Sequence, residues 1–137
     1  MAYWHLKSEP LTYSFSQLQK EKRTEWTGVR NYQARLALRA MKPGDTAIFF
    51  HTGDEKTAVG IAKILTGPEA DPTAKGEDWT KVDIGPVKPL AVPVTLAQLK
   101  KTAALKKMAL VTSSRLSVGP VTAAEMKAVL ALAKTKL

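Results

Sequence analysis

The residues best suited to ligand chemistry lie between Trp26 and Arg35, where two aromatic and two arginine side chains flank a glycine. Gly28 permits a backbone bend that a residue with a Cβ resists, and Asn31 is a favourable N-cap for the periodic segment that follows. Arg30 then lies near the positive end of a helix, which favours anionic groups. An aromatic plate beside a cationic helix entrance suits a base with its phosphate. On this stretch alone, an alternative is equally open: the aromatic side chains belong to the core and the arginine side chains are solvated.

A second polar group surrounds Arg115, with hydroxyl side chains at Ser113, Ser114 and Ser117. Such a run suits hydrogen bonds to phosphate or to the edge of a base, although a capped loop fits the composition equally well. Trp79 falls on the polar face of a predicted strand, beside a long loop, and edge packing against that loop is the alternative to a binding role. Aromatic faces beside cations hold unstacked or flipped bases, so the pattern favours a binding module.

Enzyme chemistry has little support in this sequence. Because cysteine is absent, thiol catalysis is excluded, and His5 and His51 cannot form a metal cluster by themselves. Glycine-rich phosphate loops and the His-Glu-x-x-His motif are absent as well. Glu9 with Asp83 is a conceivable acid–base pair, but no spacing supports it. We therefore predict a non-enzymatic protein with no catalytic residue, no cofactor and no metal.

The charge is unevenly distributed along the 137 residues, whose net charge is +9. Residues 1–85 are nearly neutral, whereas residues 86–137 hold nine Lys/Arg against the single acid Glu125. Such asymmetry attracts a polyanion, either nucleic acid or an acidic membrane surface, and a solubilising lysine surface is the alternative. Length and hydropathy predict one domain over 1–137 that is soluble, monomeric, without membrane association, and cytoplasmic, or nuclear in a eukaryotic host.

Periodicity and capping signals predict the elements that position these residues. Strands are expected at 2–8, 46–52, 58–66 and 79–87, with a short strand or extended piece at 110–112, and helices are expected at 15–20, 31–41, 96–101 and 123–134. The 46–52 and 58–66 strands form an antiparallel hairpin, and Gly60 indicates a bulge or a close backbone approach. Residues 19–24, which lead to Trp26, and residues 67–78 are expected to be loops, the second one long and exposed. Three prolines after residue 85 predict an extended edge.

With these residues in view, the chain resembles the EVE domain family. The resemblance is carried by Tyr-Trp-His-Leu-Lys-Ser-Glu-Pro (3–10), Glu-Trp-Thr-Gly-Val-Arg-Asn-Tyr-Gln-Ala-Arg (25–35), Arg-Ala-Met-Lys-Pro-Gly-Asp (39–45), Phe-Phe-His (49–51), Trp-Thr-Lys-Val-Asp-Ile (79–84) and Ser-Arg-Leu-Ser-Val (114–118). It implies an α+β, PUA-like fold, a small β-barrel with flanking helices, related to the YTH readers of methylated adenine. It also implies recognition of a modified base in nucleic acid, with modified cytosine in DNA the usual proposal.

Motif by motif, the resemblance makes Trp26 one wall of a base pocket, with Lys7 and Ser8 as its floor. It places Asn31, Tyr32, Trp79, Ser114 and Ser117 around the rim. We expect contacts with the nucleic-acid backbone from Arg30, Arg35 and Arg115. Two alternatives stay open: a module that binds modified RNA, as the YTH relatives do, and a hydrolase or nuclease whose site would be built from carboxylates and magnesium.

Overall fold

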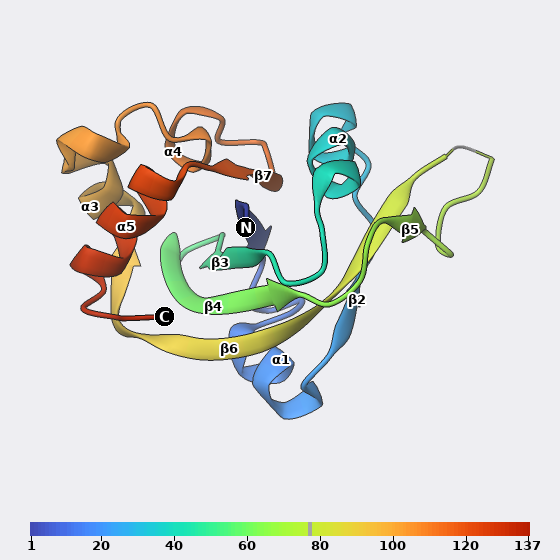
Figure 1. The fold of residues 1–137 in the computed structure, drawn as a ribbon, viewed down its shortest axis with the longest axis horizontal. Coiled ribbons are helices and arrows are strands. Elements are labelled where there is room, and N and C mark those ends of the chain that lie inside the picture. Colours follow the sequence, from blue (N-terminus) through green and yellow to red (C-terminus); the bar gives the residue numbers. More distant parts are fainter. Residues whose placement is uncertain (77) are drawn as a thin grey trace.

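A curled, mixed β-sheet forms the frame of the molecule (Figure 1). The computed structural model describes residues 1–76 and 78–137. The strands are β1 (Tyr3–Ser8), β2 (Thr24–Trp26), β3 (Thr46–His51), β4 (Thr57–Ile64), β5 (Glu69–Ala70), β6 (Thr80–Thr95) and β7 (Val118–Val121). Their order is β2-β6-β4-β3-β1-β7, and β5 also pairs with β6. The β1–β3 pair is parallel and the other pairs are antiparallel.

Helices flank this sheet, which confirms the predicted α+β class. They are α1 (Phe15–Glu21), α2 (Tyr32–Ala40), α3 (Leu96–Lys101), α4 (Ala109–Thr112) and α5 (Ala123–Leu132), with a 3₁₀ turn η1 (Ala103–Leu105). Figure 1 shows α3, α4 and α5 gathered at one end of the molecule and β5 with its loop at the other. Across the described ranges, no helix has the length and apolar character needed to cross a membrane.

The helix starts follow the capping signals in the sequence. Ser14, Asn31, Thr95 and Thr122 each accept a hydrogen bond from the backbone N–H three residues further on. These caps satisfy amides that the first helical turn leaves free. The predicted helices at 15–20, 31–41, 96–101 and 123–134 are thereby confirmed to within two residues at either end.

Two apolar cores lie on opposite faces of the sheet, and the alternation of β3 feeds both. Ala47 and Phe49 pack with α1 and α2, whereas Ile48 and Phe50 pack with residues of α3, α4 and α5. Every residue of β3 is buried, because both faces of this central strand are covered. The side chains of β1 alternate in the same way, so that Trp4 and Leu6 pack into the core that contains Phe49.

Gly60 confirms the predicted bulge, and the group that approaches it closely is a side chain and not a backbone. The register of β4 shifts around this residue, against β3 and against β6, as in a β-bulge. A Cβ at this position would also lie 2.4 Å from Cζ of Phe15, a core side chain of α1. The missing side chain therefore lets α1 pack closely on the sheet, at the level of the hairpin formed by β3 and β4.

Several segments differ from the predicted loops and strands, most of them because long-range strand pairing is invisible in a local pattern. Residues 24–26 form β2, which pairs with β6, and β7, which follows the polar segment around Arg115, pairs with β1. The expected strand at 110–112 is helix α4, where both the amide and the hydroxyl of Thr112 donate to the Met108 carbonyl. The 67–78 segment is predicted to be a long exposed loop, and its residue 77 lies outside the described residues. The described part of the segment contains the short strand β5 and the buried Asp71.

The strand predicted at 79–87 begins one residue later and runs on to Thr95, through Pro86, Pro89 and Pro93. Proline is tolerated there because β2 pairs only as far as Ile84, which leaves the later part of β6 with β4 as its neighbour in the described sheet. Two register shifts in the β4–β6 pairing accompany these prolines. The extended edge predicted from the prolines is therefore the second half of β6.

Candidate functional site

A hollow of about 380 Å³ opens at the end of β1, between the segment that follows it and β2. Its lining residues are Ser8, Thr12, Tyr13, Thr24, Glu25, Trp26 and Thr27. The volume lies at the lower end of the range of small-molecule sites, about 300–1,000 Å³. This Trp26 hollow, as we name it, combines two aromatic rings with several hydroxyl groups and one carboxylate.

Trp26 is held in place by the sheet on one side and by aromatic contacts on the other. Its backbone pairs with Val82 of β6, and its indole packs against the core that contains Phe49. The indole lies 5.7 Å from the Phe49 ring at 81° and 6.4 Å from the Tyr13 ring at 83°, between centroids. Near-perpendicular contacts of this kind are favourable for aromatic pairs. Trp26 is therefore partly buried and, at the same time, one wall of the hollow.

Hydrogen bonds fix the polar groups around this indole. The Ser8 hydroxyl donates to the Tyr13 carbonyl at 2.6 Å, which leaves its oxygen free to accept from a ligand. The Tyr13 hydroxyl donates to Glu21 at 2.7 Å. Burial and this bond to Glu21 raise the pKa of Tyr13 to about 12, so the phenol stays neutral at physiological pH. Thr12 and Thr27 add hydroxyls that both donate and accept, as the edge of a base requires.

Beside the hollow, Asp71 connects the Gly28 turn to the loop that follows β5. Its carboxylate accepts from the Gly28 amide at 2.9 Å, from the Arg30 guanidinium at 3.0 Å and from the Thr73 hydroxyl at 2.6 Å. Burial alone would raise the pKa of Asp71, but the hydrogen bonds from Thr73, Gly28 and Arg30 lower it to about 2. Gly28 has a φ of +80°, the left-handed conformation that a glycine adopts without strain. Trp26 is thus followed by a turn with a fixed geometry.

Trp79, expected on a polar face, is buried with 8% of its surface exposed. Side chains of the α2 region cover it: the Tyr32 ring stacks on it at 5.3 Å, and the Arg35 guanidinium lies 4.9 Å from its centroid. Arg30 approaches the same ring at 5.6 Å. Three predicted ligand contacts, Tyr32, Arg30 and Arg35, are thereby brought together over Trp79. Trp79 is therefore packed in the fold, but among the described residues its cover comes from the segment of Arg30, Tyr32 and Arg35 and not from the loop that precedes it.

Lys7 and Ser8, expected to share one floor, face opposite sides of the sheet. Ser8 continues the face of Trp4 and Leu6, whereas the Lys7 ammonium lies 6.0 Å from the Phe50 ring, on the side of the other core. Successive side chains of a strand point in opposite directions, so neighbours cannot line one surface. Lys7 lines a separate hollow.

The remaining predicted residues lie away from the Trp26 hollow. The Ser113–Ser117 segment runs on the Lys7 side, where the Lys7 ammonium donates to the Ser114 carbonyl at 3.1 Å and the Lys7 amide to the Ser117 carbonyl at 2.8 Å. The Asn31 side chain accepts from the Ala34 amide at 2.9 Å, which uses its carbonyl as the cap of α2. Arg115 is exposed in the turn before β7.

The acid–base pair considered from the sequence does not form a cluster. Asp83 is bound by Lys81 at 2.6 Å and by Arg23 at 2.7 Å, and these partners lower its pKa. The Glu9 carboxylate lies against Gly53, on the turn between β3 and β4. Among the residues that the structure describes, no group of three or more His, Cys, Asp or Glu side chains is arranged to hold a metal ion.

Several lining residues escape sequence reasoning because they belong to segments expected to be loops. They are Thr12, Tyr13, Thr24, Glu25 and Thr27. A signal exists at Thr24 and Trp26, whose spacing of two residues is that of one face of a strand. The segment is only three residues long, however, and the pairing with β6 that makes it a strand comes from residues 82–84. Lining residues of this kind are visible only once the sheet is assembled.

This architecture, a curled mixed sheet with flanking helices, is that of a PUA-like domain. The EVE domain model matches residues 2–132, and the chain belongs to that family. The chain is 35% identical to mouse Thymocyte nuclear protein 1 over 98% of its length and 74% of the relative's.

Solved structures agree with this assignment. A crystal structure of an Agrobacterium tumefaciens protein, 43% identical, has a TM-score of 0.95 over 98% of this chain and 94% of the other. Human THYN1, solved in complex with DNA that contains 5-methylcytosine, is 33% identical with a TM-score of 0.89, and the two chains cover each other completely. The family and the fold are therefore shown by sequence and structure together.

Proposed function

We propose that this protein is a non-enzymatic reader that binds DNA and accommodates a modified cytosine in the Trp26 hollow. The observation that carries the proposal is a partly exposed indole, fixed by Phe49 and Tyr13, beside hydroxyl groups in a hollow of ligand size. An exposed aromatic face stacks on any base, and each stack contributes about 1–3 kcal/mol. The complex of human THYN1 with 5-methylcytosine DNA supports this choice of ligand, since the two chains share fold and family.

The charge distribution supports a polyanionic partner. The helical end of the molecule, formed by α3, α4 and α5 (Figure 1), carries almost all of the excess positive charge. Its cationic residues are exposed: Lys100, Lys101, Lys106, Lys107, Arg115, Lys127, Lys134 and Lys136. Cations spread over one surface attract a phosphate backbone without selecting a sequence. In the proposed complex this end supplies affinity, and the Trp26 hollow supplies selectivity for the base.

Hydrogen bonds have to supply most of the selectivity for a modification. Burying one methyl-sized group contributes about 0.8 kcal/mol, which is roughly a fourfold preference. A hydroxymethyl group would add a donor and an acceptor. Of the polar side chains expected around the base, Ser8, Asn31 and Ser117, it is Ser8 whose hydroxyl lines the hollow. We therefore assign Ser8 to the contact with a polar substituent.

A reader without catalysis fits the chemistry of the hollow. Glu25 is the carboxylate among its lining residues, and its side chain is exposed on β2, 3.7 Å from the Lys81 ammonium. A charged, exposed carboxylate paired with a cation is a poor general base. This lining supports binding and release of an intact base.

A matched set of oligonucleotides tests the proposal. Single-stranded DNAs that differ only in cytosine, 5-methylcytosine or 5-hydroxymethylcytosine are titrated in parallel with RNAs of the same sequence, and the products are inspected by mass spectrometry. We expect the modified DNAs to bind several-fold more tightly than the plain DNA and to be recovered unchanged. Equal affinity for cytosine and its modified forms would refute base reading, and tighter binding of the RNAs would favour the YTH-like alternative. A shortened or deaminated product would refute the non-enzymatic assignment.

A further inference from the structure

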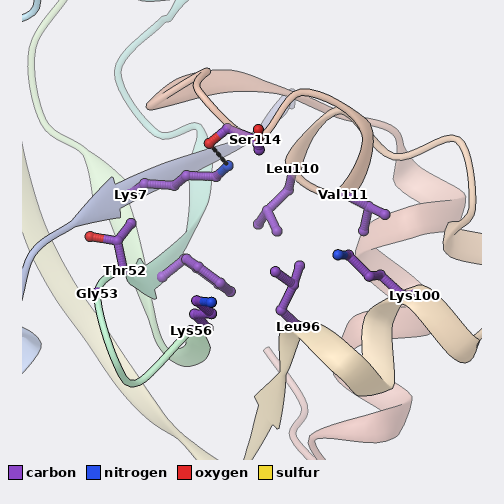
Figure 2. A pocket seen from close by; sticks show the side chains of 10 residues that line it. Lys7, Thr52, Gly53, Lys56, Leu96, Lys100, Leu110, Val111 and Ser114 are labelled. Atoms are coloured by element: carbon purple, nitrogen blue, oxygen red, sulfur yellow. Dashed lines mark hydrogen bonds between the residues drawn. The ribbon is translucent and has the colours of Figure 1, made fainter.

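A second hollow, of about 310 Å³, lies on the Lys7 side of the sheet (Figure 2). Its apolar lining comes from three elements that the fold brings together: Phe50 of β3, Leu96 of α3, and Leu110 and Val111 of α4. Phe50, Leu96 and Leu110 belong to or pack against the core beneath the helical end. An apolar recess of this volume is at the lower limit of small-molecule sites, about 300 Å³.

Three ammonium groups surround this apolar surface: Lys7, Lys56 and Lys100. Figure 2 shows Lys7 and Lys100 reaching toward the hollow from opposite sides, with Leu110 and Leu96 between them. Within residues 1–76 and 78–137, none of the three lies within 4.0 Å of a carboxylate. Three acids lie nearby: the Glu9 carboxylate lies against Gly53, a lining residue of the hollow, and Asp54 and Glu55 line a neighbouring hollow that shares Lys56 and Lys100. Among the described side chains, the three ammonium groups of the recess therefore have no direct ion pair and can bind an anion.

Lys7 is the most constrained of these cations. Its ammonium donates to the carbonyls of Ser113 and Ser114, at 3.4 and 3.1 Å, next to the last turn of α4. An ammonium has three N–H donors, so one stays available for a ligand. Burial lowers the pKa of Lys7, and an anion at this point would compensate the lost hydration of its charge. Its position at the end of β1 is fixed by its backbone bond to the Ser117 carbonyl.

We propose that this Lys7 hollow binds a small organic acid with an apolar tail. The carboxylate meets the Lys7 ammonium, Lys56 and Lys100 close the rim, and the tail covers Leu96 and Leu110. Charge-assisted hydrogen bonds supply the anion selectivity, and burial of the tail supplies affinity. A bare phosphate group would leave the apolar lining unused, which is why an amphipathic acid fits better than a nucleic-acid backbone. The site is independent of the proposed base reading, because the sheet separates it from the Trp26 hollow.

The test uses octanoate as the probe and follows methyl signals of Leu110 and Val111 in the full-length chain by NMR. We expect octanoate to shift these signals in a saturable manner, at least about tenfold more tightly than 1-octanol or acetate, because each of those lacks one half of the recognised chemistry. Equal binding of octanoate and octanol would overturn the proposal. So would an unmodified oligonucleotide that shifts the same signals when octanoate does not.

Charge variants provide the second readout. Lys7→Met should weaken octanoate binding at least about tenfold by removing the charge-assisted contact. Lys100→Glu, at an exposed position whose change leaves the core intact, should weaken it to a similar degree by repulsion. Lys127→Glu on α5, which lines a different hollow, is the matched control and should bind as the parent does. Unchanged octanoate affinity in folded Lys100→Glu would contradict the assignment, whatever happens to Lys7→Met.

Discussion

Lys7 and Ser8 are consecutive residues of β1, yet each lines a different hollow on a different face of the sheet. The strand alternates between two cores, so Ser8 joins Trp26 and Lys7 joins Phe50. A short motif that looks like one site in the sequence is thus divided between two. Substitutions at these neighbouring positions should consequently have separate effects on ligand binding.

The basic helical end predicts a strong salt dependence. For a single strand, the slope of log K against log salt concentration should be about −0.7 for each phosphate that the protein neutralises. Replacing Lys106 and Lys107, both exposed after η1, by glutamine should weaken every oligonucleotide alike and make this slope shallower by about 0.7 for each phosphate no longer neutralised. Titrations between low and moderate salt measure the slope. Lys75→Gln, at the opposite end, is the control, and a flat response of the parent protein would contradict the polyanion partner.

Asp71 should make the stability depend on acid pH. Its pKa is lowered from 3.8 to about 2 in the fold, so the carboxylate stabilises the folded state above pH 4 and loses that contribution as the pH falls from about 4 to 2. A shift of this size corresponds to about 2 kcal/mol. Asp71→Asn should lose about this amount at pH 7 and flatten the acid limb of the stability curve, measured by urea unfolding.

The exposed Asp54, on the turn after β3, is the matched control for that experiment. Asp54→Asn should unfold like the parent at pH 7, because this exposed side chain has none of the hydrogen bonds from Gly28, Arg30 and Thr73 that hold the buried Asp71. An Asp71→Asn variant as stable as the parent at pH 7 would mean that the link between the Gly28 turn and the Thr73 loop contributes nothing to folding.

Gly60 should not accept a side chain. A Cβ there would lie 2.4 Å from the Phe15 ring, which is itself buried, so Gly60→Ala should displace α1 and cost about 1–3 kcal/mol. Gly67→Ala is the control, because a Cβ at that position meets no atom within 4 Å. Thermal unfolding of the two variants makes the comparison, and equal midpoints would show that the packing of α1 on β4 is looser than described.

Local signals predict much of this fold. Period-two alternation locates β1, β-rich runs on either side of a turn locate the hairpin of β3 and β4, and capping residues such as Asn31 and Thr122 locate helix starts. Strands that exist through a distant partner, such as β2 and β7, escape prediction, since three or four residues carry too weak a pattern. The short helix α4 is mispredicted as a strand because Leu110-Val111-Thr112 is rich in β-branched residues.

The site is predictable at Trp26 and less so around it. An indole beside a glycine turn is a recognisable signal, and Ser8 follows from its place at the end of a strand. Trp79 shows where prediction from the sequence fails. Tyr32 and Arg35, which cover its ring, belong to a helix more than 40 residues earlier in the chain, and no local pattern contains that contact. The lining residues Thr12 and Thr27 escape prediction for the same reason, because the assembly of the sheet brings them together.

The most direct test of base reading is the affinity of Trp26→Ala for a single-stranded DNA containing 5-methylcytosine. Removal of the stack should weaken binding by about 1–3 kcal/mol, roughly five- to 150-fold, and leave the salt slope nearly unchanged, because the indole neutralises no phosphate. Thermal unfolding must accompany the titration, since the indole also packs on Phe49. Leu11→Ala, an exposed apolar residue near the hollow, is the control and should bind as the parent does. A folded Trp26→Ala protein with parental affinity would contradict base reading in the Trp26 hollow.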